Sequence, residues 1–469
     1  MLQTEAWYRN DPHPMTSGIA MALRIVDRVW RSRFARNVAV VVSGTAGATV
    51  INIAFAPLIT RIYGPEALGL QGTFMAIVAV AIPVAALAYP IAIVLPRDDS
   101  DALGLVRLSA ILSFVVTLSA AALLVLGGDW LAVALGAESV AGYFFLIPVA
   151  MLFAAWMEIV YQWLIRKKEF GVIARSAVAH SLLLNSVRVG IGWLHPVGAV
   201  LIVLATVGNA LYAALLFIGA WRCYQPEATE SGKRGRTHLK ELVCRYRDFP
   251  LYRAPQNFIN AASQSLPVLM LASFFGPAAA GFYTLAKAVM VMPLNLIGKG
   301  VSDVFYPRIA EAAHNDENLS RYIVHATVAL LAIGVVPFGL VMLLGPWLFR
   351  FVFGNEWDVA GEYARWLALW LLAALINRPS VATIPVLSLQ RGFLIYEIAN
   401  IVFRLAAIGI GSMIFESDVA AVALFSLAGL ASNLLLVAWV LRAARRKLAP
   451  PRLRRDSKTE GKKYATHDL

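Results

Sequence analysis

Charged side chains inside apolar stretches are the residues of this sequence that could do chemistry. Nine lysines and arginines fall within stretches apolar enough to cross a membrane, whereas only four acids do, one of them Glu362 at the first residue of its stretch. A charge at the centre of a bilayer costs about 2.5–3.5 kcal/mol on insertion scales, so such residues usually face a cavity or a partner. The excess of cations therefore predicts an anionic substrate. These basic residues are Arg107, Arg175, Arg188, Arg253, Lys287, Lys299, Arg365, Arg378 and Arg404.

The seventh apolar stretch carries a polar stripe made of Arg253, Asn257, Asn260 and Gln264. Their spacing of i, i+4, i+7 and i+11 places them on one helix face. An arginine can bind phosphate through its planar fork, and amides can hydrogen-bond sugar hydroxyls. An internal repeat, described below, sets Asn52 of the first stretch opposite Gln264. The alternative is that these amides only join packed helices.

Four further basic residues are candidate ligands of the same anion. Lys287 lies about two turns from the outer end of the eighth stretch, and Arg378 precedes a proline that could free a helix carbonyl for its charge. Arg404 follows Glu397 by seven residues, so an internal ion pair is the alternative to a ligand role. Arg188 lies in the outer half of the fifth stretch. It could either face the lumen or pack against other helices.

The acids raise the question of coupling, because a carboxylate in low dielectric can exchange a proton. Glu158 has no cationic neighbour at i±3 or i±4 and is the first candidate; Glu397 and Asp303 are the others, although Asp303 can neutralise Lys299. We expect no cofactor and no metal site. Proton coupling, sodium coupling or the membrane potential could drive the protein. Gly298-Lys299-Gly300 lacks the rest of a phosphate-binding loop, which disfavours ATP hydrolysis.

The composition requires a membrane. Of the 469 residues, 59% are hydrophobic and only 15% are charged, with a mean hydropathy of +0.68; soluble domains have about 25% charged residues. A water-soluble enzyme is excluded. A span needs about 20 apolar residues, and we predict an all-α protein with about twelve spans: 38–60, 70–95, 105–126, 142–165, 171–194, 196–221, 249–275, 279–306, 322–344, 362–389, 392–415 and 419–441.

The remaining basic residues set the orientation. With the N-terminus inside, cytoplasmic segments hold 30 lysines and arginines and external connectors hold two. The positive-inside rule then puts both termini in the cytoplasm and accounts for most of the net charge of +13 without nucleic acid. The predicted parts are a basic amphipathic segment on membrane lipids, an N-lobe, a basic linker, a C-lobe and a basic tail, at 1–37, 38–221, 222–248, 249–441 and 442–469.

An internal repeat divides the chain. Gly64-Pro65-Glu66-Ala67-Leu68-Gly69 is echoed 212 residues later by Gly276-Pro277-Ala278-Ala279-Ala280-Gly281, each in the external turn between the first two spans of a half. Proline stops the incoming helix, and the second glycine lets helix ends approach. A second echo relates Trp130 and Gly136 to Trp347 and Gly354. Six spans per half predict two lobes related by a pseudo-two-fold axis along the membrane normal.

At these turns, and over residues 275–311, the chain resembles polysaccharide flippases of the Wzx type, which transport O-antigen and exopolysaccharide units. They belong to the multidrug/oligosaccharidyl-lipid/polysaccharide exporter superfamily. The resemblance implies alternating-access translocation of an oligosaccharide linked to undecaprenyl diphosphate, from the inner to the outer leaflet of a bacterial inner membrane. It implies a lumen between the lobes that holds the headgroup, and partners among polysaccharide polymerases and the export machinery.

Two other functions remain open. A cation-coupled drug exporter of the same superfamily would favour acidic side chains for cationic drugs, whereas this chain has a basic excess in its spans. A membrane glycan polymerase or ligase would need a larger external loop than the longest predicted connector, about residues 345–361. Both are less consistent with the sequence than a flippase.

Overall fold

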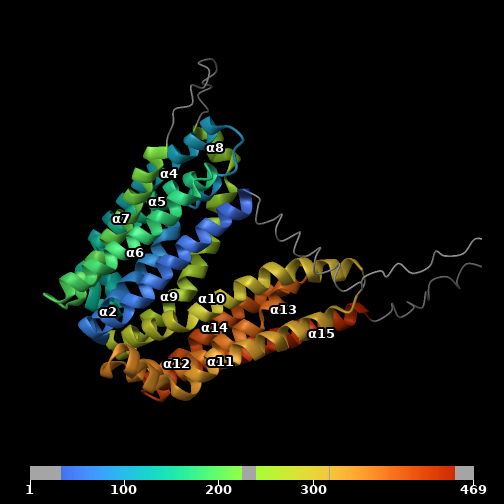
Figure 1. Cartoon of the computed structure of the whole chain (residues 1–469). Coiled ribbons are helices and arrows are strands. Elements are labelled where there is room, and N and C mark those ends of the chain that lie inside the picture. Colours follow the sequence, from blue (N-terminus) through green and yellow to red (C-terminus); the bar gives the residue numbers. More distant parts are fainter. Residues whose placement is uncertain (1–32, 224–238, 316, 449–469) are drawn as a thin grey trace, which may run out of the picture. The chain divides into compact units, whose positions relative to one another are not determined.

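The computed structural model describes residues 33–223, 239–315 and 317–448, and these residues form helices and short turns (Figure 1). The all-α fold class is thereby confirmed. Most of the predicted amphipathic segment 1–37, the centre of the linker 222–248 and most of the tail 442–469 lie outside the described residues. Side chains of 299–304, which include Asp303, are also outside them.

Eleven helical segments of the described chain are long and apolar enough to cross a membrane. The difference from twelve comes from α2 (Arg33–Ala85), which contains the first predicted span and most of the second. Gly64 interrupts α2 with non-helical torsion angles, φ 69° and ψ 176°. The protein is therefore a multi-pass membrane protein, and the count of twelve spans stays a prediction.

Contacts divide the chain into two compact units. The first contains the chain up to Tyr63 together with Phe74–Ser265, and the second contains Gly64–Thr73 and the chain from Leu266. This grouping assigns the first repeat turn to the second unit and the start of the seventh span to the first unit. The lobe boundaries 38–221 and 249–441 stay a prediction.

In the first unit, α5 packs on α4 and α7, and α6 packs on α7 (Figure 1). Leu164, Val172, Ile173 and Leu216 are buried where three of these helices meet. The unit contains part of α2, α3 (Tyr89–Ala92), α4 (Asp99–Ala134), η1 (Glu138–Tyr143), α5 (Leu146–Arg166), α6 (Phe170–Gly192), α7 (Gly198–Cys223), α8 (Leu239–Arg245), η2 (Phe249–Arg253) and the first half of α9 (Ala254–Phe275).

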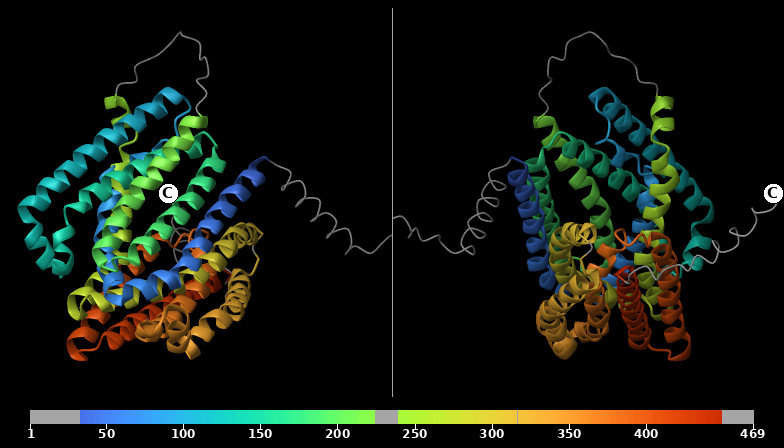
Figure 2. Two further views of the ribbon diagram at one scale, coloured as in Figure 1. Left: turned by 60° about the vertical axis from the view of Figure 1, so that its left-hand side comes forward. Right: turned by 90° about the vertical axis from the view of Figure 1, so that its right-hand side faces the viewer.

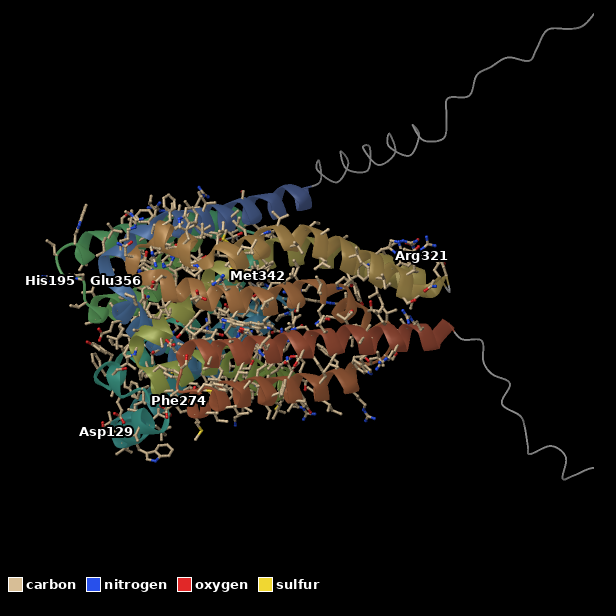
Figure 3. The ribbon with its side chains drawn as sticks, turned by 90° about the horizontal axis from the view of Figure 1, so that it is seen from below. Asp129, His195, Phe274, Arg321, Met342 and Glu356 are labelled. Carbon is tan, nitrogen blue, oxygen red and sulfur yellow. The ribbon has the colours of Figure 1, made fainter. Side chains whose placement is uncertain are left out.

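In the second unit, α12 packs on α10, α11 and α15, and α14 packs on α15; Figure 2 shows these helices from two further sides. The Arg365 Nε donates a hydrogen bond of 2.8 Å to the Met342 carbonyl, which ties α12 to the middle of α11; Figure 3 labels Met342. The remaining elements are α10 (Pro277–His314), α11 (Leu319–Phe353), η3 (Asn355–Trp357), α12 (Asp358–Ile376), α13 (Arg378–Thr383), α14 (Gln390–Ile414) and α15 (Asp418–Leu448).

Two predicted spans are broken helices. The second span was predicted to continue to residue 95, but α2 ends at Ala85, and Leu87 and Ala88 have positive φ of 49° and 60° before the short α3. The tenth span breaks at Asn377, between α12 and α13. A proline lies just inside each following helix, where its missing N–H has no carbonyl to reach. Apolar composition therefore overestimated the helix length at both places.

The repeated turns share one backbone conformation. Gly276 has φ 84° and ψ 179°, close to the angles of Gly64, in a region that is essentially restricted to glycine. A Cβ added at Gly69 would lie 1.7 Å from the Pro277 carbonyl oxygen, and one at Gly281 would lie 2.1 Å from the Pro65 oxygen. The second glycine of each motif thus permits contact between the two turns.

Candidate functional site

An arginine between two aromatic rings is the centre of the first candidate site. Arg404 of α14 places its Cζ 3.8 Å from the ring centroid of Trp370 on α12 and 4.1 Å from that of Phe425 on α15. Both distances are well within the range of cation–π attraction. The rings occupy positions beside the guanidinium and hold its charge inside the second unit.

A second cation joins this cluster from α10. The Lys287 Nζ lies 5.9 Å from the ring centroid of Tyr283, and the Tyr283 ring meets Phe425 edge-on at 6.2 Å. The charges of Lys287 and Arg404 interact. We call Tyr283, Lys287, Trp370, Arg404 and Phe425 the cation–aromatic cluster. Two positive charges near one another in an apolar setting favour the approach of an anion.

Two polar atoms of this cluster lack a hydrogen-bond partner among the described residues. The Arg404 Nε and the Tyr283 hydroxyl are buried, and neither has a hydrogen-bond partner among the described residues. Glu397 forms no ion pair with Arg404 in the described part of the chain, because two turns of α14 separate them, a rise of about 10.5 Å. The ion pair considered from the sequence is therefore not formed within the part of the chain that the structure describes.

A pocket in the first unit brings together three other predicted residues. Glu158 of α5 and Asn257 and Asn260 of α9 line a cavity of about 380 Å³. The Glu158 Oε1 accepts a 2.7 Å hydrogen bond from the Gln162 Nε2. Neither asparagine side chain hydrogen-bonds to a described residue. We call this cavity the Glu158 pocket.

The broken segment after α2 forms one wall of the Glu158 pocket. Ala86, Ala88, Pro90 and Ile91 all line it. Non-helical backbone at membrane depth is tolerated where it is buried in protein or lines a cavity. The left-handed backbone conformation of Ala88 therefore occurs where the non-helical chain lines a cavity.

Arg166, at the end of α5, forms hydrogen bonds with the segment 93–99 that follows this wall. Its Nη1 donates to the carbonyls of Pro96 at 2.6 Å and Ile93 at 3.3 Å, and its Nη2 lies 2.9 Å from an Asp99 carboxylate oxygen. The Arg166 side chain is only 10% exposed, whereas the neighbouring Lys167 is 38% exposed, pairs with Asp99 and lies over the Trp163 ring without bonding to residues 86–98.

We expect Arg166→Ala to loosen residues 86–98. Charge-assisted hydrogen bonds contribute about 1.5–3 kcal/mol each, so losing this group should speed amide exchange in the segment by at least tenfold. Hydrogen–deuterium exchange with mass spectrometry measures this. Lys167→Ala is the matched control and should change exchange less than threefold; equal effects of the two variants would contradict an anchoring role for Arg166.

The other predicted residues of the first unit lie outside the Glu158 pocket. The Asn52 Oδ1 accepts a 2.6 Å hydrogen bond from the Asn185 Nδ2, which is the interhelical role considered as the alternative. The Arg188 Nε is buried without a partner among the described residues, and its carbonyl accepts a 2.8 Å bond from the Tyr63 hydroxyl. Arg253 is exposed, and its Nη1 donates to the Gln256 side chain at 3.0 Å. Gln264 is also exposed.

In the second unit, Arg378 begins α13 and packs against α10. A Cβ added at Gly298 would lie 3.2 Å from the Arg378 Nε. The preceding residue, Asn377, is buried and donates a 2.9 Å hydrogen bond to Asn433 of α15. No group of three or more potential metal ligands occurs in the residues that the structure describes.

Sequence reasoning missed the aromatic residues around Arg404 and the wall of the Glu158 pocket. Trp370 and Phe425 resemble any other apolar residue of a span. The buried pair of Asn377 and Asn433 carries a signal that was overlooked, because buried amides within spans are typical of helix–helix hydrogen bonds. Only the tertiary structure showed that Glu158 shares a pocket with the amide stripe.

Comparison with known proteins places this chain among proteins of polysaccharide synthesis. The sequence model of the family described as "Polysaccharide biosynthesis protein" matches residues 58–362. The amylovoran biosynthesis protein AmsL of Erwinia amylovora is 22% identical over 114 residues, a match that covers 24% of this chain and 29% of that protein. The match therefore spans less than a third of the length of this curated relative.

Two solved structures share the fold over most of this chain. An inward-facing multidrug resistance MATE family transporter of the MOP superfamily has a TM-score of 0.63 and 15% identity, over 87% of this chain and 99% of that one. The lipid II flippase MurJ in an inward closed conformation has a TM-score of 0.61 and 12% identity, over 87% and 89%. At these identities the likeness shows that this chain shares its fold with both proteins, and no more.

Proposed function

This chain belongs to the polysaccharide biosynthesis protein family, and from that premise we propose that it is a flippase for a polyprenyl-diphosphate-linked oligosaccharide. It moves the oligosaccharide from the inner to the outer leaflet of a bacterial inner membrane by alternating access, with both of its termini in the cytoplasm. The chain acts as a transporter and forms no glycosidic bond. A polysaccharide polymerase and the export machinery use the translocated product.

The cation–aromatic cluster is the observation that supports this function best. An arginine binds phosphate through the edge of its guanidinium, and the Nε of Arg404, between its two aromatic rings, has no hydrogen-bond partner among the described residues. Lys287 adds a second positive charge nearby. A diphosphate has the charge to match both, whereas a lipophilic cation would be repelled. This favours a lipid-linked anion over the cationic drugs that an exporter of the same fold would carry.

The other predicted basic residues extend the proposal to further steps. Arg253, at the cytoplasmic start of the seventh span, is exposed and suited to first capture of the diphosphate. Arg378 and Arg188 are candidates for contact during passage. Moving one charge across 100 mV is worth about 2.3 kcal/mol, so an interior-negative potential would drive the outward movement of a dianion. A cationic path lowers the intervening barrier.

The test replaces Arg253, Lys287 and Arg378 together by glutamine in cells that lack the native gene. We expect surface polysaccharide to be lost at normal protein levels while the lipid-linked oligosaccharide accumulates on the cytoplasmic leaflet. The matched control is Arg107→Gln with Arg175→Gln, because both arginines lie near span ends and are exposed; it should leave polysaccharide at wild-type levels.

Three outcomes would contradict the proposal. Normal surface polysaccharide in the triple variant would show that these cations are not required. Extrusion of lipophilic cations by the wild-type protein would indicate a drug exporter. Formation of glycosidic bonds by the purified protein would indicate a polymerase or ligase.

A further inference from the structure

The polar groups of the Glu158 pocket are arranged to receive hydrogen-bond donors. Glu158 is half-buried, its Oε1 accepts a bond from Gln162, and its Oε2 accepts none from a described residue. An ionised carboxylate only accepts hydrogen bonds, whereas an amide both donates and accepts. Asn257 and Asn260 present such amides with no described partner. Together they match a group that carries several hydroxyls.

The rest of the pocket is apolar and combines small side chains with the larger Ile82, Ile91 and Met157. Ala154 and Ala155 of α5, Ala261 of α9 and Pro83 of α2 contribute to its lining. Small-molecule sites typically have volumes of about 300–1,000 Å³ and combine apolar walls with a few polar groups. A pyranose ring has this character, since its hydroxyls surround a ring with C–H faces.

Charge and size exclude two other occupants. The Glu158 carboxylate repels a diphosphate, which is acceptor-only and anionic. A bare cation is held by oxygen ligands at about 2.0–2.6 Å and would leave most of the 380 Å³ empty. A neutral, hydroxyl-bearing group of sugar size satisfies both the polar side and the apolar wall.

We infer that the Glu158 pocket is a subsite for an uncharged sugar residue of the lipid-linked substrate. Glu158 accepts a hydrogen bond from a sugar hydroxyl, Asn257 and Asn260 exchange hydrogen bonds with neighbouring hydroxyls, and the alanine and proline wall packs against the ring. This inference rests on the proposed function. It assigns Glu158 to substrate recognition, where the sequence had suggested a coupling role.

The experiment compares two lipids bound to the full-length protein in lipid nanodiscs. One is the lipid-linked oligosaccharide purified from cells that lack the protein, and the other is undecaprenyl diphosphate without sugar. We expect the wild-type protein to bind the glycosylated lipid at least tenfold more tightly. Glu158→Gln should reduce that affinity about tenfold, since a neutral acceptor makes a weaker hydrogen bond than a carboxylate. Its affinity for undecaprenyl diphosphate should not change.

A second variant fills the pocket without altering charge. Ala261→Leu places three extra carbons into the cavity and should weaken binding of the glycosylated lipid at least tenfold. Ala262→Leu is the matched control, because Ala262 is the next residue of α9, is equally half-buried and does not line the pocket. The affinity for undecaprenyl diphosphate reports in each variant that the protein is folded.

Each contrary result has its own meaning. If both pocket variants bind the glycosylated lipid as the wild type does, the sugar subsite is overturned while the proposed function stands. If neither lipid binds to the wild-type protein, or no such lipid accumulates in the cells, the proposed function fails as well. If replacing Na⁺ by choline weakens wild-type binding and Glu158→Gln removes that dependence, the pocket is a cation site and the inference is wrong.

Discussion

Arg404→Gln is expected to reduce transport of the lipid-linked oligosaccharide at least tenfold without lowering protein stability. A desolvated cation–π contact is worth about 2 kcal/mol or more, but burying a charge without an ion pair is costly. Arg404 has no carboxylate partner in the described part of the chain. Glutamine removes this charge, so the temperature of thermal unfolding should stay equal or rise.

Two measurements separate the roles of Arg404. Transport is followed by the appearance of oligosaccharide on the outer leaflet, and stability by thermal unfolding in detergent. Arg404→Lys keeps the charge but loses the planar group that faces Trp370 and Phe425, so we expect intermediate transport. Arg107→Gln is the control for loss of a positive charge and should leave transport unchanged. If Arg404→Gln lowered stability and protein level in parallel with transport, Arg404 would have a structural role only.

Gly69→Ala and Gly281→Ala are expected to destabilise the protein by about 3 kcal/mol each, at the upper end of typical overpacking costs. Each new Cβ would meet a backbone carbonyl oxygen of the other turn, at 1.7 Å from Pro277 and 2.1 Å from Pro65. A backbone atom cannot rotate away as a side chain can, so the two turns must separate. Thermal unfolding and the amount of protein in the membrane measure the loss.

Gly276→Ala separates torsional strain from steric contact at the same turn. No atom lies within 4 Å of a Cβ built there, but its φ of 84° and ψ of 179° are unfavourable for alanine and cost about 1–3 kcal/mol. Gly190→Ala is the control, because it lies inside α6 and a Cβ there also meets no atom within 4 Å. It should be neutral or slightly stabilising. Equal stability of all four variants would show that neither effect operates.

The positions of the helices were predictable because membrane spans have a strong and local signal. A helix of about twenty apolar residues pairs its backbone groups within itself, and its side chains are compatible with the surrounding lipid. Each span is therefore encoded within its own stretch. The turns at Gly64 and Gly276 were predictable for a similar reason: their glycines are required by the backbone of the turn itself. Apolar composition did not predict the breaks after Ala85 and at Asn377, because it does not distinguish a helix from a turn that other helices cover; Pro90 and Pro379 are the local signals that the sequence carries for them.

What the sequence could not determine is which polar residues meet. In a soluble protein the apolar face of a helix identifies its buried side, but lipid is as apolar as a protein core, so every face of a span can be apolar. The polar stripe of the seventh span could therefore be predicted, whereas the pocket that Asn257 and Asn260 share with Glu158 could not. Arg404 could be predicted as a cation within a span, but its cation–π contacts with Trp370 and Phe425 depend on how α12, α14 and α15 pack. The sequence alone determined a multi-pass, all-helical membrane protein with an excess of basic residues in its apolar stretches. The packing of the helices decided which of these residues meet aromatic rings, amides or one another.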